Sequence, residues 1–152
     1  GALLEEELDL LRRDFIRGGR CAGVDKDLVR EAADRHPWIV QALAELNEQL
    51  YPHDLHFGYR VVDEILAFVH LGLESPLRDG FEVLDPPDPE RVAFDWAVSM
   101  KLLPRFHGQR QRLEEPLEAV RRWAERYGCR RVAAEVERLL RKLHTEGFAA
   151  YL

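Results

Sequence analysis

Apolar residues recur at intervals of three and four along the chain, and each run ends close to a glycine or a proline. This spacing places the apolar residues of each run on one face of an α-helix. Within residues 57–69 such a face comprises Val62, Ile65, Leu66 and Val69. No alternating pattern bounded by turn residues persists long enough to indicate a sheet. The sequence therefore predicts an all-α protein, a single bundle of about seven helices.

Capping residues predict where the first helices begin and end. An apolar stripe that stops before Gly18 and Gly19 predicts the first helix, and Asp25 predicts the N-cap of a short second one. Pro37, in a favoured first-turn position, begins a third helix that ends at Tyr51 and Pro52. A fourth helix contains Arg60 and runs to about residue 71 or 72. The stripe of the first helix consists of Leu3, Leu4, Leu8, Leu11 and Phe15.

The second half of the chain shows the same punctuation. Residues 74–89 contain four prolines and a glycine, so we expect them to be mostly loop. A helix is predicted over about 89–103 from the residues at its start. Asp88 is a cap, Pro89 is a first-turn proline, and Glu90 is an acid that the helix dipole favours. The segment RFHGQRQR then reads as an exposed basic connection. Gly128 and Gly147 are expected to end the last two helices.

Composition narrows the class of protein. A chain of 152 residues with 46% hydrophobic and 33% charged residues fits one soluble domain, 1–152. No apolar run is long enough to cross a bilayer, and the acidic GALLEEELDLL lacks the basic start of a signal peptide, so we expect a cytoplasmic protein without a membrane partner. Cys21 and Cys129 lack metal-ligand spacing, and we interpret both as reduced structural thiols.

Charge is unevenly distributed along the chain. Residues 1–100 carry 10 Lys and Arg against 21 Asp and Glu, a balance of −11, whereas residues 101–152 carry 12 against 7, a balance of +5. The densest basic cluster predicts either a nucleic-acid face or a docking surface for acidic protein. Interleaved glutamates favour a third interpretation, a solvated face of local ion pairs. The candidate residues are Arg105, Arg110, Arg112, Arg121 and Arg122.

The motif FGYR, residues 57–60, leads directly into the fourth helix. Gly58 and Tyr59 would shape the turn and place Arg60 in the first helical turn. Free backbone N–H groups and the helix dipole favour an anion there, and a guanidinium binds phosphate well. The motif therefore predicts a phosphate-sensing arginine, with a merely solvated Arg60 as the alternative.

A complete catalytic site is not evident. The sequence has no GxxxxGK[ST] loop, GxSxG elbow, HExxH motif or glycine-rich dinucleotide turn, so we assign no catalytic residue to this chain. His53 and His56 lack the further ligands that a metal site needs, and we interpret them as surface or packed histidines. We therefore expect neither a metal nor another cofactor on this chain, and any chemistry to be shared with another domain.

Two separated motifs carry a resemblance to one family. ALAELNEQLYPHDLH (42–56) followed by FGYRVVDEILAFV (57–69) resembles the lid region of McrB-like AAA+ NTPases, the motors of bacterial restriction and defence systems. AFDWAVSMKLLPRFHGQRQRLEEPL (93–117) is similar to that family's pattern of an aspartate-bearing helix, a KLLP end and a basic turn. The resemblance covers residues 36–117, with 118–152 as a C-terminal helical extension, and it does not reach residues 1–35.

The resemblance implies a helical subdomain that closes over a nucleotide bound by a separate AAA+ core. Arg60 matches the position from which a lid can direct a sensor arginine toward the γ-phosphate. The implied cofactor of the parent motor is ATP or GTP with magnesium, and the implied partners are the AAA+ core or neighbouring subunits and an effector nuclease, with DNA reached indirectly. The family's P-loop, acidic magnesium-binding strand and arginine finger are absent, so the chain is expected to be a fragment or a stand-alone relative. The alternative hypothesis is a self-contained helical adaptor or nucleic-acid-binding module.

Overall fold

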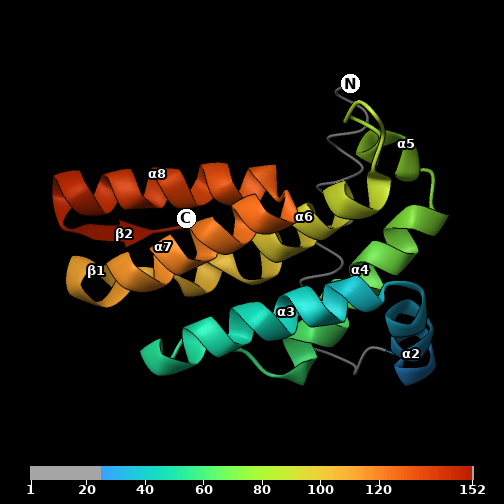
Figure 1. Ribbon diagram of the computed structural model, residues 1–152, viewed down its shortest axis with the longest axis horizontal. Helices are drawn as coiled ribbons and strands as arrows, with labels where there is room; N and C mark the ends of the chain where they lie inside the picture. The colour runs from blue at the N-terminus through green and yellow to red at the C-terminus, as the bar shows by residue number, and fades with distance from the viewer. Residues whose placement is uncertain (1–24, 152) are drawn as a thin grey trace.

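The computed structural model describes residues 25–151 (Figure 1). Its described part is mostly helical, with seven α-helices and one small sheet. The helices are α2 (Lys26–Arg35), α3 (Pro37–Leu50), α4 (Tyr59–Glu74), α5 (Arg78–Phe81), α6 (Pro89–Lys101), α7 (Arg110–Tyr127) and α8 (Arg130–Glu146). Two 3₁₀ turns, Tyr51–His53 and Leu103–Arg105, follow α3 and α6, and the strands are β1 (His107–Gln109) and β2 (Phe148–Ala150).

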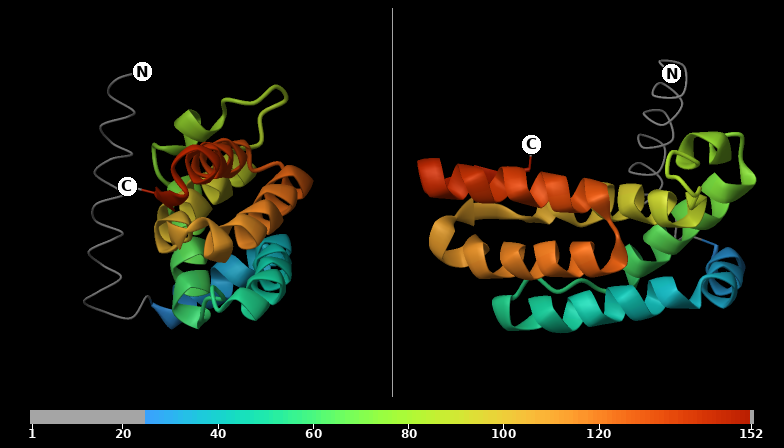
Figure 2. Two further views of the ribbon diagram at one scale, coloured as in Figure 1. Left: turned by 90° about the vertical axis from the view of Figure 1, so that its left-hand side faces the viewer. Right: turned by 45° about the horizontal axis from the view of Figure 1, so that its top comes forward.

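Helix α6 lies at the centre of the bundle. It packs against α4 on one side and α8 on the other, and α7 runs back along α8 (Figures 1 and 2). Helix α3 packs on α7, and α2 crosses α4 at one end of the molecule. One continuous apolar core joins these helices, with Leu66 and Trp123 buried inside it and Trp38 and Trp96 half-buried at its edge. The second half of the chain is thereby packed onto the first.

Most predicted helix ends agree with the structure. The Asp25 carboxylate accepts from the Asp27 N–H at 2.8 Å, and the Asp88 carboxylate accepts from the Arg91 N–H at 3.2 Å, so both predicted N-caps are confirmed. Helices α7 and α8 end at Gly128 and Gly147, whose φ angles of 70° and 75° suit glycine. The stripe that predicted a first helix, with Cys21, lies outside the described residues.

The structure confirms one predicted connection and corrects another. Residues 74–89 are mostly loop, as predicted, and they also contain the short helix α5, because Leu77 and Phe81 are buried and hold one turn against the core. The basic segment 105–112 is not simply an exposed connection. It contains β1 and the first turn of α7, a helix that continues through Pro116.

Strands β1 and β2 add a small sheet to a fold predicted to be all-α. They pair antiparallel, with Gly108 opposite Ala149, and the Arg110 N–H donates to the Gly147 carbonyl at 3.0 Å. The pairing joins the start of α7 to the end of α8. Since α7 and α8 are also joined at Gly128, this helical hairpin is closed at both ends.

Helix α8 receives its N-terminal cap from another helix. Asp95 on α6 accepts from the N–H groups of Arg131 and Val132 at 2.7 and 2.9 Å, while the N-cap residue Cys129 makes no side-chain bond. These two donors belong to the first turn of α8, where no backbone acceptor is available. The aspartate noted in the sequence motif 93–117 thus has a structural role.

Among the described residues, the longest and most apolar helices fall short of what is needed to cross a bilayer.

Candidate functional site at the start of helix α4

The turn that precedes Arg60 is held by Asn47 on α3. The Asn47 side chain donates to the Phe57 carbonyl at 2.9 Å and accepts from the Phe57 N–H at 2.7 Å. The ring of Phe57 is buried in the core. This double hydrogen bond with a buried aromatic anchor fixes the position from which α4 begins.

Gly58 and Tyr59 contribute little to the shape of this turn. Gly58 has φ −95° and ψ −176°, an extended backbone that any residue adopts, and an added Cβ would meet nothing within 4 Å. Tyr59 is 88% exposed, so its ring is presented to solvent instead of packing against the turn. The sequence analysis missed Asn47, although a polar amide beside Leu46 in a helix interior, where asparagine is disfavoured, could have indicated it.

Arg60 is exposed but anchored. Its side chain is 68% exposed, and its Nε lies 3.4 Å from Glu64 one turn further along α4. The second oxygen of Glu64 lies 3.1 Å from the Lys101 Nζ on α6, and these two side chains are only 10% and 9% exposed. The buried pair neutralises itself, which leaves the charge of Arg60 in excess at the surface.

An apolar groove of about 490 Å³ lies beside this turn, between α2, α3 and α4. Its walls include Val29, Val40, Val62 and Leu66, and Tyr59 stands at its rim. Asp63 is the charged residue among the groove's lining side chains. Burial raises the pKa of the Asp63 carboxyl above its usual value, an effect that the positive charge of Lys26 partly opposes. The groove is therefore an apolar surface with one carboxyl group at its edge.

The predicted basic cluster is divided by local interactions. Arg110 lies 2.7 Å from Glu114, and Arg121 lies 2.6 Å from Glu118. Arg105 donates to the His56 carbonyl at 2.9 Å, which ties the 3₁₀ turn after α6 to the turn before α4. Three of the five arginines thus have partners inside the chain, as the interleaved glutamates indicated for two of them.

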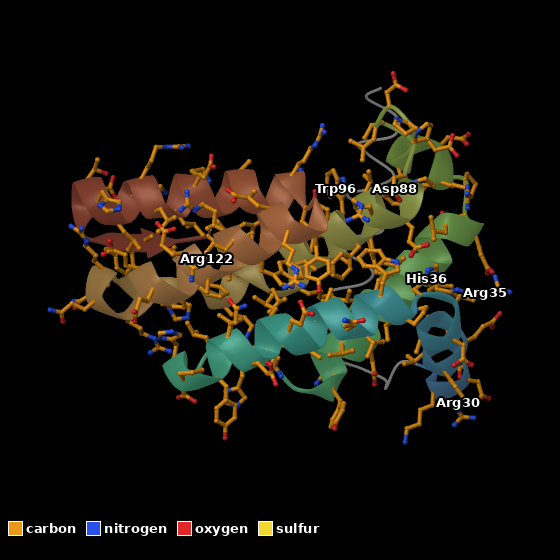
Figure 3. All side chains as sticks on the ribbon, in the orientation of Figure 1. Arg30, Arg35, His36, Asp88, Trp96 and Arg122 are labelled. Atoms are coloured by element: carbon orange, nitrogen blue, oxygen red, sulfur yellow. The ribbon has the colours of Figure 1, made fainter. Side chains whose placement is uncertain are left out.

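The arginines on α7 also point in different directions. At about 100° per residue, Arg112 and Arg121 lie on opposite sides of this helix. Figure 3 shows Arg122 on α7, far from Arg30 and Arg35 on α2 at the other end of the molecule. The described residues consequently gather no single strongly basic face on α7.

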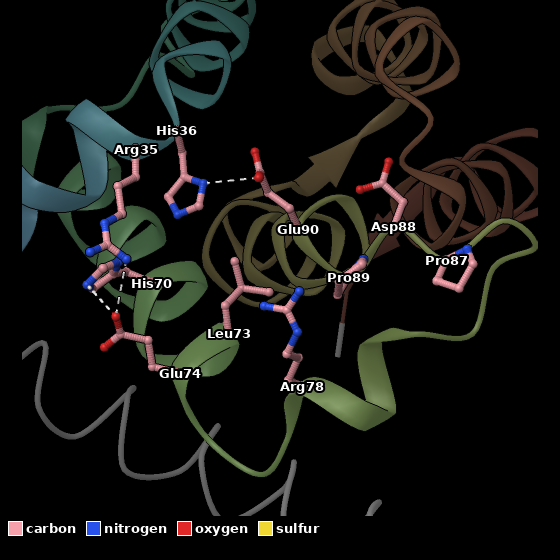
Figure 4. Close-up of a pocket in the computed structure, with 10 residues that line it drawn as sticks. All are labelled: Arg35, His36, His70, Leu73, Glu74, Arg78, Pro87, Asp88, Pro89 and Glu90. Carbon is pink, nitrogen blue, oxygen red and sulfur yellow. Dashed lines mark hydrogen bonds and ion pairs between the residues drawn. The ribbon is translucent and has the colours of Figure 1, made fainter.

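A second, polar cavity of about 350 Å³ lies where α2 and α3 meet α4 and α6 (Figure 4). Two buried histidines line it: His36 lies 3.2 Å from Glu90, and His70 lies 3.6 Å from Glu74. Glu74 also approaches Arg35 at 3.5 Å. These contacts tie the junction of α2 and α3 to α6 through Glu90, and the end of α2 to α4 through Glu74.

No group of side chains within residues 25–151 could hold a metal ion. Cys129 is fully buried and is a free thiol, as the sequence analysis expected. Burial raises the pKa of its thiol, and the negative charge of Asp95 adds to this effect, so the thiol stays protonated and unreactive.

Comparison with known proteins gives one family. Residues 9–148 match the family described as a domain of unknown function, DUF8727. The chain belongs to this family. The match covers α2–α8 and β1 and ends at Phe148, the first residue of β2, and it also includes residues 9–24, which precede the described part. No curated protein and no solved structure matches the chain.

Proposed function

We propose that this DUF8727 domain is a helical lid of a McrB-like AAA+ NTPase, which closes over a nucleotide held by a separate core domain. The observation that carries the proposal is the state of Arg60, a guanidinium that is both exposed and positioned. An arginine that senses phosphate needs solvent access to meet its ligand and a fixed base to reach it reproducibly. Glu64 and Lys101 supply that base, and Asn47 fixes the turn from which the helix begins.

The electrostatics of the triad favour an anionic ligand. Lys101, Glu64 and Arg60 together carry one net positive charge, which Arg60 presents within the first turn of α4, while the Asp63 carboxyl belongs to the apolar groove beside it. The free N–H groups of that turn add a positive electrostatic potential to the charge of Arg60. A phosphate on a neighbouring core would meet both. In this proposal the chain contributes one arginine to a site whose P-loop and magnesium ligands belong to the partner, and it hydrolyses no nucleotide alone.

The alternative functions are a helical adaptor and a nucleic-acid-binding module. The split basic cluster gives little support to direct DNA contact, because Arg110 and Arg121 already pair with glutamates. In this proposal the lid belongs to a cytoplasmic restriction or defence system, in which the motor and an effector nuclease, and not the lid, contact DNA.

Photocrosslinking at Tyr59 tests the proposal. The exposed Tyr59 is replaced by p-benzoylphenylalanine in cells that make the whole system, and the crosslinked protein is identified by mass spectrometry. We expect a protein with a P-loop. The matched control places the same residue at Phe148, which is also exposed but lies on β2. Crosslinks from Tyr59 only to proteins without a P-loop would exclude the lid function and favour the adaptor.

A kinetic test then examines Arg60 in the crosslink-defined complex. Arg60→Ala should lower kcat for nucleotide hydrolysis by about 30- to 1,000-fold, by analogy with other donors that stabilise transition-state charge. Arg141→Ala, a change of an exposed arginine on α8, is the control and should leave kcat unchanged. Hydrolysis that is equally fast in the Arg60→Ala complex would remove this arginine from the nucleotide site.

A further inference from the structure

The groove between α2, α3 and α4 leaves apolar side chains open to solvent in the described part of the chain. Its walls come from three helices, and Val40 and Tyr59 at its edge are 39% and 88% exposed. An exposed apolar groove is one of the surfaces at which a protein binds a partner or a segment of its own chain. The identity of that occupant does not depend on the proposed nucleotide role, because the groove and its apolar walls exist whatever Arg60 binds.

The chain itself carries a segment of matching chemistry next to the groove. Residues 3–15 have the apolar stripe Leu3, Leu4, Leu8, Leu11 and Phe15. As a helix, this stripe would be about 18 Å long. An amphipathic helix must bury such a stripe against another surface to be stable. The family match begins at residue 9, so much of this segment belongs to the domain shared by the family.

The geometry of the connection allows the segment to reach the groove. Helix α2 begins at Lys26, and its residue Val29 already lines the groove. Residues 16–25, which include Gly18, Gly19 and Gly23, could span up to about 33 Å when extended. A chain that leaves α2 here can therefore turn back along the groove instead of crossing the molecule.

Charge complements the apolar match. Asp63 is the charged side chain among those lining the groove. Arg12 follows Leu11 and would lie at about 100° from it around a helix, at the edge of the stripe. A helix seated on the groove by its leucines can thus bring a guanidinium to the groove's carboxylate.

We propose that residues 3–15 form an amphipathic helix that docks in the groove between α2, α3 and α4, with Leu4, Leu8 and Leu11 against its apolar walls. The docked helix covers the side of α4 that carries Val62 and Leu66. It lies next to Tyr59 and Arg60, so it is the first element that a partner approaching this end of α4 encounters. The segment is an internal ligand of the domain.

Paramagnetic relaxation tests this docking in the full chain. A nitroxide is attached through Glu6→Cys, on the opposite side of the predicted helix from Leu4 and Leu11, in a Cys21→Ser background. Cys129 stays unlabelled because it is fully buried. We expect the methyl signals of Val40 and Val62 to weaken, while those of Val136 on α8 keep their intensity.

Matched substitutions and a mixing experiment separate the possible occupants. Leu8→Asp should restore the weakened signals and lower the ratio of folded to unfolded protein by about 10- to 100-fold, because a buried leucine is lost. Arg13→Asp places an aspartate about 140° from Leu8 and about 160° from Leu11, outside the stripe, and should alter the ratio by only about twofold. Unchanged methyl signals in the labelled chain would refute the docking. In a mixing experiment, chains that carry the nitroxide but no isotope label are added to isotope-labelled chains that carry no nitroxide. Weakened methyl signals in this mixture would refute the docking as well, because a second copy would then fill the groove.

Discussion

Removing the Asp95 carboxylate should destabilise the protein through helix α8, which lies on a different part of the chain. In Asp95→Ala, the N–H groups of Arg131 and Val132 lose acceptors at 2.7 and 2.9 Å. The loss of an N-terminal cap costs about 0.5–2 kcal/mol, and a buried donor without a partner costs about 1–3 kcal/mol. Asp95 is only 7% exposed, so relief of its desolvation offsets part of this loss. We expect a decrease of about 2–4 kcal/mol in the free energy of unfolding.

Urea unfolding followed by circular dichroism and tryptophan fluorescence measures this change. In thermal unfolding of a domain of this size, each kcal/mol lost from the free energy of unfolding lowers Tm by about 2–4 °C. Tm should therefore fall by about 4–16 °C. Asp34→Ala, which removes an exposed aspartate on α2, is the matched control and should change stability by less than about 0.5 kcal/mol. An Asp95→Ala protein as stable as this control would refute the capping role.

The pH dependence of the same site has a definite sign. Burial raises the pKa of the Asp95 carboxyl above its usual 3.8, and this effect exceeds the lowering by the two backbone N–H groups. The folded protein therefore takes up the proton at a higher pH than the unfolded chain does. As pH falls from neutral through the raised pKa toward 3.8, wild type should gain stability relative to Asp95→Asn, which cannot titrate. A stability difference that is constant over this range, or that shifts in favour of Asp95→Asn, would contradict the assignment.

Further predictions concern the core, the buried ion pair, the turn before α4 and the basic cluster. Leu66→Ala should cost about 2–5 kcal/mol in urea unfolding, because Leu66 lies in the continuous core. Lys101→Ala should cost up to about 3–5 kcal/mol by leaving the buried Glu64 carboxylate with only the exposed Arg60 as its partner, and the further change Glu64→Gln should recover part of that loss. Gly58→Ser should stabilise the protein by about 0.5–1 kcal/mol by adding an N-cap side chain in an open position, whereas Gly128→Ser, at φ 70° and close to the Arg91 side chain, should destabilise it. Duplex DNA should bind in a fluorescence titration with a Kd no better than about 10⁻⁴ to 10⁻⁶ M at physiological salt, and sub-micromolar binding lost on replacing three of the five candidate arginines by glutamate would favour a nucleic-acid module.

The sequence predicted the helices well where local chemistry decides the structure. The caps at Asp25 and Asp88 and the ends at Gly128 and Gly147 depend on residues within one turn, and each was found where expected. The two strands were missed because each has only three residues and Gly108 pairs with Ala149 far along the chain. Such pairing leaves no local periodicity to detect.

In the candidate site too, features set by neighbouring residues could be predicted, whereas contacts between distant elements could not. Arg60 at the start of a helix could be predicted from FGYR, but its anchoring could not, because Lys101 reaches Glu64 from another helix. Asn47 and Phe57 likewise form a pair across ten residues and a change of element. Local ion pairs on α7, such as Arg110 with Glu114, were predictable from their spacing of four residues.

The closure of the α7–α8 hairpin at both ends has a mechanical consequence. Neither helix can slide along the other without breaking either the β1–β2 pairing or the turn at Gly128, so we expect the hairpin to resist shear between its two helices. Asp95 fastens the Gly128 end of the hairpin to α6. A load applied at the β1–β2 end would therefore be passed by the whole hairpin to α6, which packs directly on α4, the helix that carries Arg60.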